Sequence, residues 1–296
     1  LSMKRFTLIS LLVLLVVLVI AVFPVSAQLG DSDVSSFTVQ NVSGGNATVT
    51  VSFIAEDGTV FTAPTLNDLG GGVTNPFTLV DGASQQVFVP NIPAAQLPSG
   101  RYSVLISADA QVVAQAGLAG TGTTRFSGSY VGFDSGSTPV YMPTINFNYY
   151  GWYSMISVQN VGNDVTDITM TITCNAATPF QGTLTADDVP AMASVTWPLK
   201  SVTPTGFTSS TVCEGSAVIE STGQPIVAVN KNNQPAVGAT NSFEAASSGA
   251  DKLYIPNLQK NYSSWNSALT IQKLTAGNTT VTVEYSDGDP DDTCNL

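Results

Sequence analysis

A long segment occurs twice in this chain, and the spacing of its two copies restricts the possible folds. Residues 140–159 align without a gap on residues 253–272, 113 positions later, and seven of the 19 positions from Tyr141 to Gln159 are identical. The identical pairs are Tyr141/Tyr254, Pro143/Pro256, Asn148/Asn261, Tyr149/Tyr262, Trp152/Trp265, Ser154/Ser267 and Gln159/Gln272. This period exceeds a solenoid repeat and is close to the size of one β-sandwich domain. We therefore expect a tandem array, which is typical of proteins used for reach, adhesion or assembly.

The repeat continues into a strand pattern. Val39-Gln-Asn-Val42 recurs as Val158-Gln-Asn-Val161, and downstream of each copy apolar residues alternate with Thr or Ser. The aligned apolar residues are Val49, Val51 and Phe53, then Ile168, Met170 and Ile172, then Val281, Val283 and Tyr285. Such alternation indicates half-buried antiparallel strands, and we predict that the first two sets face a core. A further match at 113 residues joins Ser103/Ser216, Ile106/Ile219 and Gln111/Gln224, with a turn between two strands in each copy.

These registers predict the domain organisation of an all-β chain. We expect a first sandwich over residues 28–139, a second over 140–252, and the truncated start of a third over 253–296. A sandwich needs about 100 residues, so the last segment is too short to close one. The alternative is that this segment completes an edge of the second sandwich. Because the chain opens Leu1-Ser-Met3 and stops inside a repeat, we expect it to be part of a longer protein.

The first 27 residues have the pattern of a secretory signal peptide. Lys4-Arg5 precede an apolar run from Phe6 to Phe23, and Val25-Ser-Ala27 forms a small-x-small cleavage site. We expect cleavage before Gln28. The alternative is an uncleaved anchor, which would be the chain's contact with a membrane.

The charge of the exported chain narrows its partners. Removing Lys4 and Arg5 leaves 7 basic against 21 acidic residues, a net charge of −14. That balance argues against nucleic acid and against anionic membrane surfaces as partners.

The cysteines fit an oxidising compartment. Cys174 continues the apolar face of Ile168, Met170 and Ile172, and Cys213 precedes a predicted strand of the same unit. We predict a disulfide between Cys174 and Cys213, with two separate buried thiols as the alternative. Cys294 is left over, which indicates a partner further along a longer chain or an intermolecular bond.

Few residues could support catalysis. The chain contains no histidine, which removes Ser-His-Asp and Cys-His constellations and histidine-based zinc sites. The adjacent acids Asp187-Asp188 could serve glycoside hydrolysis, but we expect them in a solvated turn. We predict no enzyme activity, no cofactor and no metal.

One acidic cluster is a weak calcium candidate. Asp287, Asp289 and Asp291 alternate as oxygen ligands do in calcium loops. Pro290 disrupts that spacing and no Glu closes the loop, so a structural turn is favoured.

An aromatic cluster is the best candidate for contact with a ligand. It contains Tyr149, Tyr150, Trp152 and Tyr153, with Tyr262 and Trp265 at the repeated positions. Exposed rings stack on sugars, whereas buried rings would belong to a core or to the junction between units. Because tryptophan recurs at one position of the repeat, we expect burial near the start of each unit, close to the Tyr-x-Pro segment that links it to the unit before.

The combination of Tyr141-Met-Pro143, Asn148-Tyr149, Trp152 and Val158 to Gly162 resembles the tandem Ig-like repeat regions of large exported bacterial cell-surface proteins. The resemblance covers roughly residues 130–285 and implies Ig-like sandwiches and an exported location. We expect a secreted or cell-surface structural and adhesive protein, whose partners are other cell-surface proteins or polysaccharide. The alternative is an array of carbohydrate-binding modules in a secreted protein.

Overall fold

The computed structural model describes residues 33–67, 71–120, 127–236, 238–261, 267–275, 277–286 and 293–294. These residues form antiparallel strands and one short 3-10 turn, η1 (Val89–Asn91), and contain no α-helix. The all-β expectation is therefore confirmed. The predicted signal peptide lies outside the described residues. Within the described ranges, no helix is long and apolar enough to cross a membrane.

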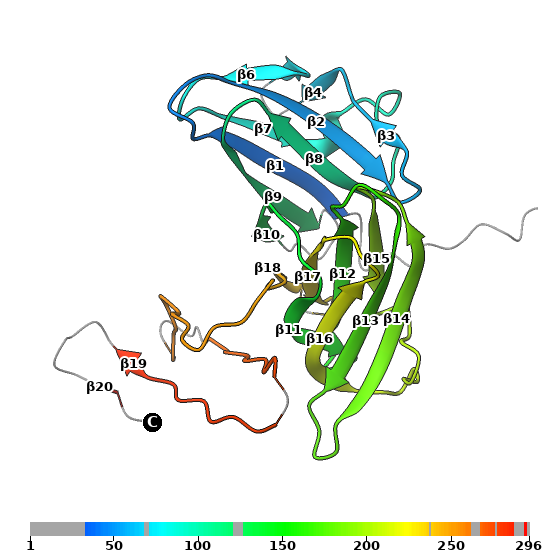
Figure 1. Ribbon diagram of the computed structural model, residues 1–296, viewed down its shortest axis with the longest axis vertical. Helices are drawn as coiled ribbons and strands as arrows, with labels where there is room; N and C mark the ends of the chain where they lie inside the picture. Colours follow the sequence, from blue (N-terminus) through cyan, green and yellow to red (C-terminus); the bar gives the residue numbers. More distant parts are fainter. Residues whose placement is uncertain are drawn as a thin grey trace, which may run out of the picture.

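The first sandwich is formed by β1 to β10 (Figure 1). One sheet has the strand order β10-β9-β1-β7, and the other has the order β3-β2-β6 with β8 also paired to β2. A small hairpin, β4 with β5, lies outside both sheets. The strands are β1 (Asp33–Asn41), β2 (Ala47–Ala55), β3 (Val60–Phe61), β4 (Thr65–Asn67), β5 (Gly72–Thr74), β6 (Phe77–Leu79), β7 (Ser84–Phe88), β8 (Tyr102–Ala108), β9 (Val112–Gly120) and β10 (Ser127–Val131).

The second sandwich is formed by β11 to β18 and repeats this arrangement. Its sheets have the orders β15-β12-β17-β18 and β11-β16-β13-β14. Thus β12, β13, β15, β16, β17 and β18 take the places of β1, β2, β7, β8, β9 and β10. The strands are β11 (Val140–Phe147), β12 (Tyr153–Asn160), β13 (Thr166–Cys174), β14 (Phe180–Val189), β15 (Ser194–Pro198), β16 (Cys213–Ser221), β17 (Ile226–Gln234) and β18 (Ala239–Glu244).

The predicted inward faces are confirmed in both sandwiches. The aligned residues of β2 and β13 are all buried: Val49, Val51, Phe53, Ile168, Met170 and Ile172 are each at most 1% exposed. Each set belongs to a separate apolar core between the two sheets of its own sandwich. Two cores, each enclosed by its own pair of sheets, make two packed units.

A side chain hydrogen-bonds to β2 between its two short partner strands, β3 and β6. β3 pairs with β2 at Phe53 and Ile54, whereas β6 pairs with it at residues 47–49. The amide of Asn75 fills the gap: its oxygen accepts the N–H of Val51 at 3.0 Å, and its nitrogen donates to the Val51 carbonyl at 2.8 Å. The polar groups of β2 are therefore satisfied where no strand lies beside them.

One predicted equivalence is shifted by a residue. The N–H of Val42 donates to the carbonyl of Gln111, and the N–H of Val161 donates to that of Pro225. Gln111 therefore corresponds to Pro225 and not to Gln224. The turn between β16 and β17 is one residue longer than the turn between β8 and β9, whereas Ile106 and Ile219 do occupy equivalent places opposite Val51 and Met170.

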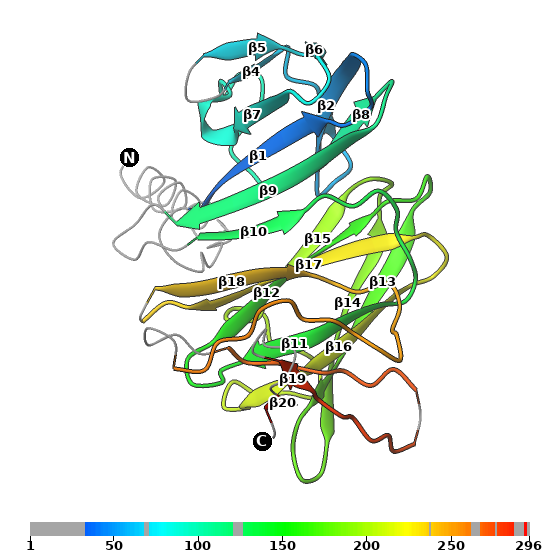
Figure 2. The same ribbon diagram turned by 90° about the vertical axis from the view of Figure 1, so that its left-hand side faces the viewer.

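Polar contacts join the two sandwiches, which lie one above the other in Figure 2. The hydroxyl of Ser103 donates to the carbonyl of Met192 at 2.6 Å, and the N–H of Val131 donates to the carboxylate of Glu244 at 2.5 Å. Burial, and secondarily the charge of Glu244, raise the pKa of the nearby Tyr130 phenol. These contacts place the end of β10 beside β18.

The chain after β18 does not continue the sheets. In residues 253–261, 267–275 and 277–284 no strand is formed, so the alternative of an added edge strand on the second sandwich is not what these residues show. The expected strand through Val281 and Val283 is also absent there, and both residues are exposed. In the described part of this region, a pair of two-residue strands follows, β19 (Tyr285–Ser286) with β20 (Thr293–Cys294). An apolar strand without a neighbouring sheet has nothing to bury its face against.

Candidate functional site

The aromatic cluster forms a tight hairpin between β11 and β12. Tyr149 and Trp152 exchange two backbone hydrogen bonds, of 3.2 and 2.8 Å, around the two-residue loop Tyr150-Gly151. Both loop residues have positive φ, +48° for Tyr150 and +80° for Gly151, as in a type I′ turn. Asn or Asp normally precedes the glycine in such turns, because a larger side chain is strained there. This hairpin holds a tyrosine in that place.

The turn presents Tyr150 to solvent. Its side chain is 80% exposed, and its ring centroid lies 4.8 Å from that of Tyr149, with the planes inclined at 74°. The amide of Gln234, at the end of β17, donates to the Tyr150 carbonyl at 2.7 Å. The backbone of the loop is therefore anchored while the ring at its tip is free.

Tyr149 is tied to a carboxylate of the neighbouring strand. The negative charge of Glu214 raises the pKa of the Tyr149 phenol, with smaller contributions from desolvation and from their hydrogen bond. Glu214 is in β16, opposite Asn146 of β11. This contact fixes the ring that packs against Tyr150.

A line of rings continues from the hairpin across the end of the sandwich. Tyr153 contacts Phe147 with ring centroids 6.2 Å apart, Phe147 contacts Phe207 at 5.4 Å, and Phe207 contacts Phe180 at 5.7 Å. Phe147 and Phe207 are buried, whereas Phe180 is 37% exposed. The hydroxyl of Tyr153 donates to the side-chain oxygen of Asn148 at 2.9 Å. The hairpin is therefore continuous with a line of packed aromatic rings.

Buried polar groups beneath the hairpin join the two sheets. β11 has an irregular register between Met142 and Ile145, where Pro143 supplies no N–H. The carbonyl of Thr144 accepts a 2.7 Å hydrogen bond from Asn230 of β17. In addition, the hydroxyl of Ser154 accepts the Asn146 N–H at 2.9 Å. The irregular segment at Pro143 and Thr144 is thus joined to the opposite sheet through the Thr144 carbonyl.

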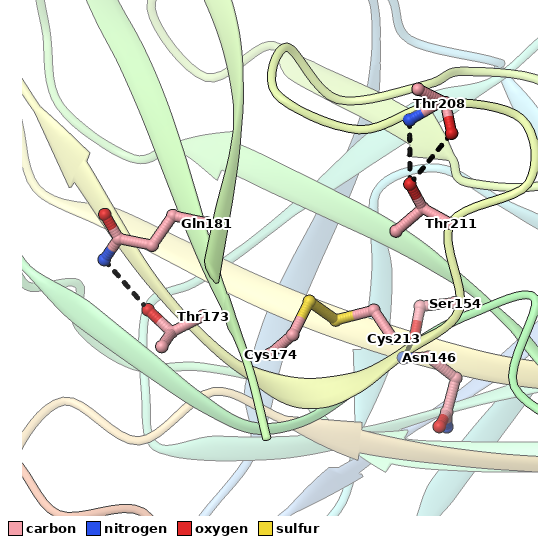
Figure 3. Close-up of a disulfide and its surroundings, with 8 residues drawn as sticks. All are labelled: Asn146, Ser154, Thr173, Cys174, Gln181, Thr208, Thr211 and Cys213. Atoms are coloured by element: carbon pink, nitrogen blue, oxygen red, sulfur yellow. Dashed lines mark hydrogen bonds between the residues drawn. A yellow bond between two sulfur atoms is a disulfide. The ribbon is translucent and has the colours of Figure 1, made fainter. Parts of the chain in front are cut away.

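The predicted disulfide between Cys174 and Cys213 is present (Figure 3). It joins the end of β13 to the start of β16, with Cα atoms 5.3 Å apart. Cys213 lies opposite Phe147, the last residue of β11. The bond therefore closes the end of the sheet that carries the hairpin.

The hairpin lies at the opposite end of β12 from the contact between Ser103 and Met192. β12 runs from Tyr153 at the hairpin to Asn160, and the neighbouring Gln159 donates to the carbonyl of Met192, which also contacts Ser103. Trp152 is therefore at the opposite end of the second sandwich from this contact and does not take part in it. It is partly buried. A role as core residue or ligand platform stays a prediction.

Other predicted site residues fall elsewhere. Tyr262 and Trp265, and the calcium candidates Asp287, Asp289 and Asp291, lie outside the described residues. Asp187 and Asp188 are exposed but belong to the end of β14, next to an irregular register, and not to a loop. No group of three His, Cys, Asp or Glu that could hold a metal occurs in the ranges that the structure describes.

The sequence patterns did not identify Phe180, Phe207 and Glu214 as neighbours of the hairpin. They come from β14, from the loop before β16 and from β16, and only the tertiary fold brings them to β11. The position of Cys213 next to Glu214 was the one available signal, because the disulfide fixes where β16 begins.

Neither a protein-family model, nor a curated protein, nor a solved structure matches this chain.

Proposed function

We propose that this chain is a secreted or cell-surface structural and adhesive protein built of Ig-like sandwiches, without catalytic activity, and that the β11–β12 hairpin is its contact surface. The repeated strand order of the two sandwiches and the contacts between them suit a spacer. The disulfide suits an oxidising environment outside the cytoplasm. The absence of histidine from the sequence supports a non-catalytic role.

One observation carries the assignment of the contact surface. Tyr150 is 80% exposed and has a backbone conformation that disfavours its own side chain. Strained residues of this kind are concentrated at functional sites, where the side chain is needed despite its cost. Exposed tyrosines are also common anchors of protein interfaces.

The ring geometry favours a protein partner over a sugar platform. Flat stacking on a polysaccharide requires rings in one accessible plane, but Tyr149 and Tyr150 are inclined at 74°. Trp152, which would be the strongest stacking residue, is half-buried. Carbohydrate binding is the second candidate because Tyr150 is 80% exposed.

The test compares binding of the exported chain to intact bacterial cells and to a glycan array. We expect Tyr150→Ala to lower cell binding at least about five-fold, a loss of about 1 kcal/mol. Phe133→Ala, which removes an exposed ring in the segment between the sandwiches, should leave it unchanged.

Treatment of the cells distinguishes the two partners. Loss of binding after protease treatment supports a protein partner. Loss after periodate treatment, together with array binding that Trp152→Ala abolishes, would support the carbohydrate alternative. Cell binding that is the same for wild type and Tyr150→Ala would overturn the assignment of the hairpin.

A further inference from the structure

The two sandwiches differ at one sheet edge. In the second sandwich β16 is hydrogen-bonded on both sides, to β13 and to β11. In the first, β8 takes the place of β16 and pairs with β2, and no strand among the described residues occupies its other side. Figure 2 shows β8 at the side of the upper sandwich with β2 next to it. An open edge of this kind is a template for an added strand.

The missing strand leaves apolar side chains incompletely covered. Val104 and Ile106 face the core of the first sandwich but are only half-buried. The equivalent residues of β16, Ala217 and Ile219, are 1% and 0% exposed. In the second sandwich the difference is made by β11, whose Val140, Met142, Ile145 and Phe147 are buried in the core. Among the described residues, the first sandwich therefore has no counterpart of the apolar strand β11.

A copy of the missing strand is present further along the chain. Leu253-Tyr-Ile-Pro-Asn-Leu258 aligns with β11 at every position from Val140 to Ile145. It forms no strand, and Leu253, Ile255 and Leu258 are 69%, 49% and 38% exposed. These three align with Val140, Met142 and Ile145, which β11 buries. The described residues thus contain an apolar edge beside which no strand lies, and a segment similar to β11 that pairs with no strand.

We infer that residues 253–258 of one molecule pair with β8 of a second copy of this chain. The pairing of β11 with β16 gives the register, because residues 253–258 align with β11 and β8 is equivalent to β16. Leu253 lies opposite Ile106 and Ile255 opposite Val104, as Val140 lies opposite Ile219 and Met142 opposite Ala217. Pro256 occupies the bulge, and Leu258 follows it opposite Tyr102. Backbone hydrogen bonds provide affinity and the alternating apolar side chains provide specificity.

A second copy is the acceptor because the segment is held against its own second sandwich. Ala246 and Tyr141 exchange two backbone hydrogen bonds of 2.8 Å, and Gln272 donates to the carbonyl of Ala217 at 3.1 Å. These contacts anchor the chain on both sides of the segment, beside β11 and β16. In Figure 1 the orange trace after β18 does not approach β8.

Removal of the signal peptide is a condition of this pairing, so the inference rests on the proposed export. Val22-Phe-Pro24 stands 119 residues before Tyr141-Met-Pro143, where a β11-like strand of the first sandwich would begin. Cleavage before Gln28 removes these residues and leaves the edge of β8 to another molecule. Because donor and acceptor are different surfaces, each molecule can engage two others, and the contact leads to chains or rings.

The experiment measures the mass of the exported chain, beginning at Gln28, by sedimentation over a range of about 1 to 100 µM. All proteins carry Cys294→Ser, so that the unpaired cysteine cannot form oligomers by itself. We expect association that increases with concentration. Ile255→Asp should weaken it at least about ten-fold, because pairing would bury an unpaired carboxylate. Leu269→Asp is the matched control, since Leu269 is 40% exposed but outside the segment, and it should associate like wild type.

A cysteine pair tests the register. In Val104→Cys/Ile255→Cys, oxidation should give disulfide-linked dimers and larger species, which the single variants do not form. A chain that is monomeric throughout, equal association of Ile255→Asp and Leu269→Asp, or a cross-link that forms only within one molecule would each overturn the inference. None of these results depends on binding to cells, so the proposed adhesive function stands or falls separately.

Discussion

Asn160 makes the same contacts in the second sandwich that Asn41 makes in the first. Each is fully buried at the end of its strand, and each donates its side-chain nitrogen to the last residue of a strand in the opposite sheet, Leu79 at 2.9 Å and Val189 at 3.1 Å. Each side-chain oxygen also accepts the N–H two residues further on, at 2.9 Å. The asparagine of the Val-Gln-Asn motif therefore forms a hydrogen-bonded clasp between the two sheets of its sandwich. This structural role explains why the motif recurs.

Loss of this clasp should destabilise the second sandwich. Asn160→Ala removes three donated hydrogen bonds, one of them to the carbonyl of the buried Val189. We expect a decrease of about 2–4 kcal/mol in the free energy of unfolding. Fluorescence of the buried Trp197 reports this transition during denaturation. Gln40→Ala, which removes one long bond from an exposed side chain, is the control. A loss below about 0.5 kcal/mol would contradict the clasp.

The disulfide should contribute strongly to the same transition. Cys174 and Cys213 are 39 residues apart, and closing a loop of this length stabilises a fold by about 4 kcal/mol in the chain-entropy model. The double variant Cys174→Ser/Cys213→Ser should unfold at a clearly lower guanidinium concentration. Cys294→Ser should not shift the midpoint. The expectation fails if the double variant and the wild type unfold together.

Tyr150 should show a conflict between stability and binding. Asn tolerates positive φ better than tyrosine does, so Tyr150→Asn should stabilise the second sandwich by about 0.5–1 kcal/mol. The same change should weaken cell binding, because it removes the exposed ring. Gly151→Ala is the opposite control and should destabilise the hairpin, since Gly151 has φ +80°. Thermal unfolding and cell binding, both measured on the wild type, Tyr150→Asn and Gly151→Ala, test whether stability and binding change in opposite directions.

The first sandwich should lose stability in acid through Asp109. The Asp109 carboxylate accepts the N–H of Thr48 at 2.7 Å, and this hydrogen bond lowers its pKa below the ordinary value of 3.8. A carboxylate with a lowered pKa stabilises the fold above its unfolded pKa, and this contribution is lost as the pH falls through the folded pKa. NMR titration of the Asp109 carboxyl between about pH 5 and 2 measures it.

The second sandwich supplies the control for this titration. Thr222 stands in the place of Asp109, and its hydroxyl oxygen accepts the N–H of Asp167 at 3.1 Å. A hydroxyl does not titrate in this range. Asp109→Thr should therefore keep the turn and remove the contribution of Asp109 to the loss of stability in acid. An unchanged pH profile of unfolding in this variant would exclude Asp109 as the cause.

The angle between the sandwiches should depend on the contact at Glu244. Glu244→Ala removes the acceptor of the Val131 N–H, and Ser103→Ala removes the bond to Met192. Together these changes should broaden the distance distribution in small-angle scattering without lowering the unfolding midpoint of either sandwich. A distribution identical to that of the wild type would show that other contacts fix the angle.

The sequence predicted the strands whose two faces differ most. Val49, Val51 and Phe53 alternate with hydroxyl residues, and a one-residue slip would expose all three, so the pattern determines the face. The disulfide was predictable for the same reason, because Cys174 continues the inward face of β13.

Features set by chain packing were not predictable in this way. Gln111 is structurally equivalent to Pro225 because the turn before β17 has one extra residue. The identity of Gln111 and Gln224 in the sequence alignment concealed this shift. The place of Trp152 depends on the direction of β12 relative to the first sandwich, which no local pattern encodes. Phe207 reaches the hairpin only through the fold, and the strand expected at Val283 needs a neighbouring sheet that these residues do not have.

The pairing of β11 with β16 also bears on the order of folding. Val140 pairs with Ile219, so the first strand of the second sandwich has its partner far downstream, whereas β13 and β14 are neighbours in the chain and pair directly. A polypeptide delivered from its N-terminus exposes β11 well before β16 emerges. Local hairpins form first and distant pairings last. Until β16 emerges, β11 has no partner strand to cover its apolar side chains. The rate at which the chain emerges determines how long these side chains stay exposed.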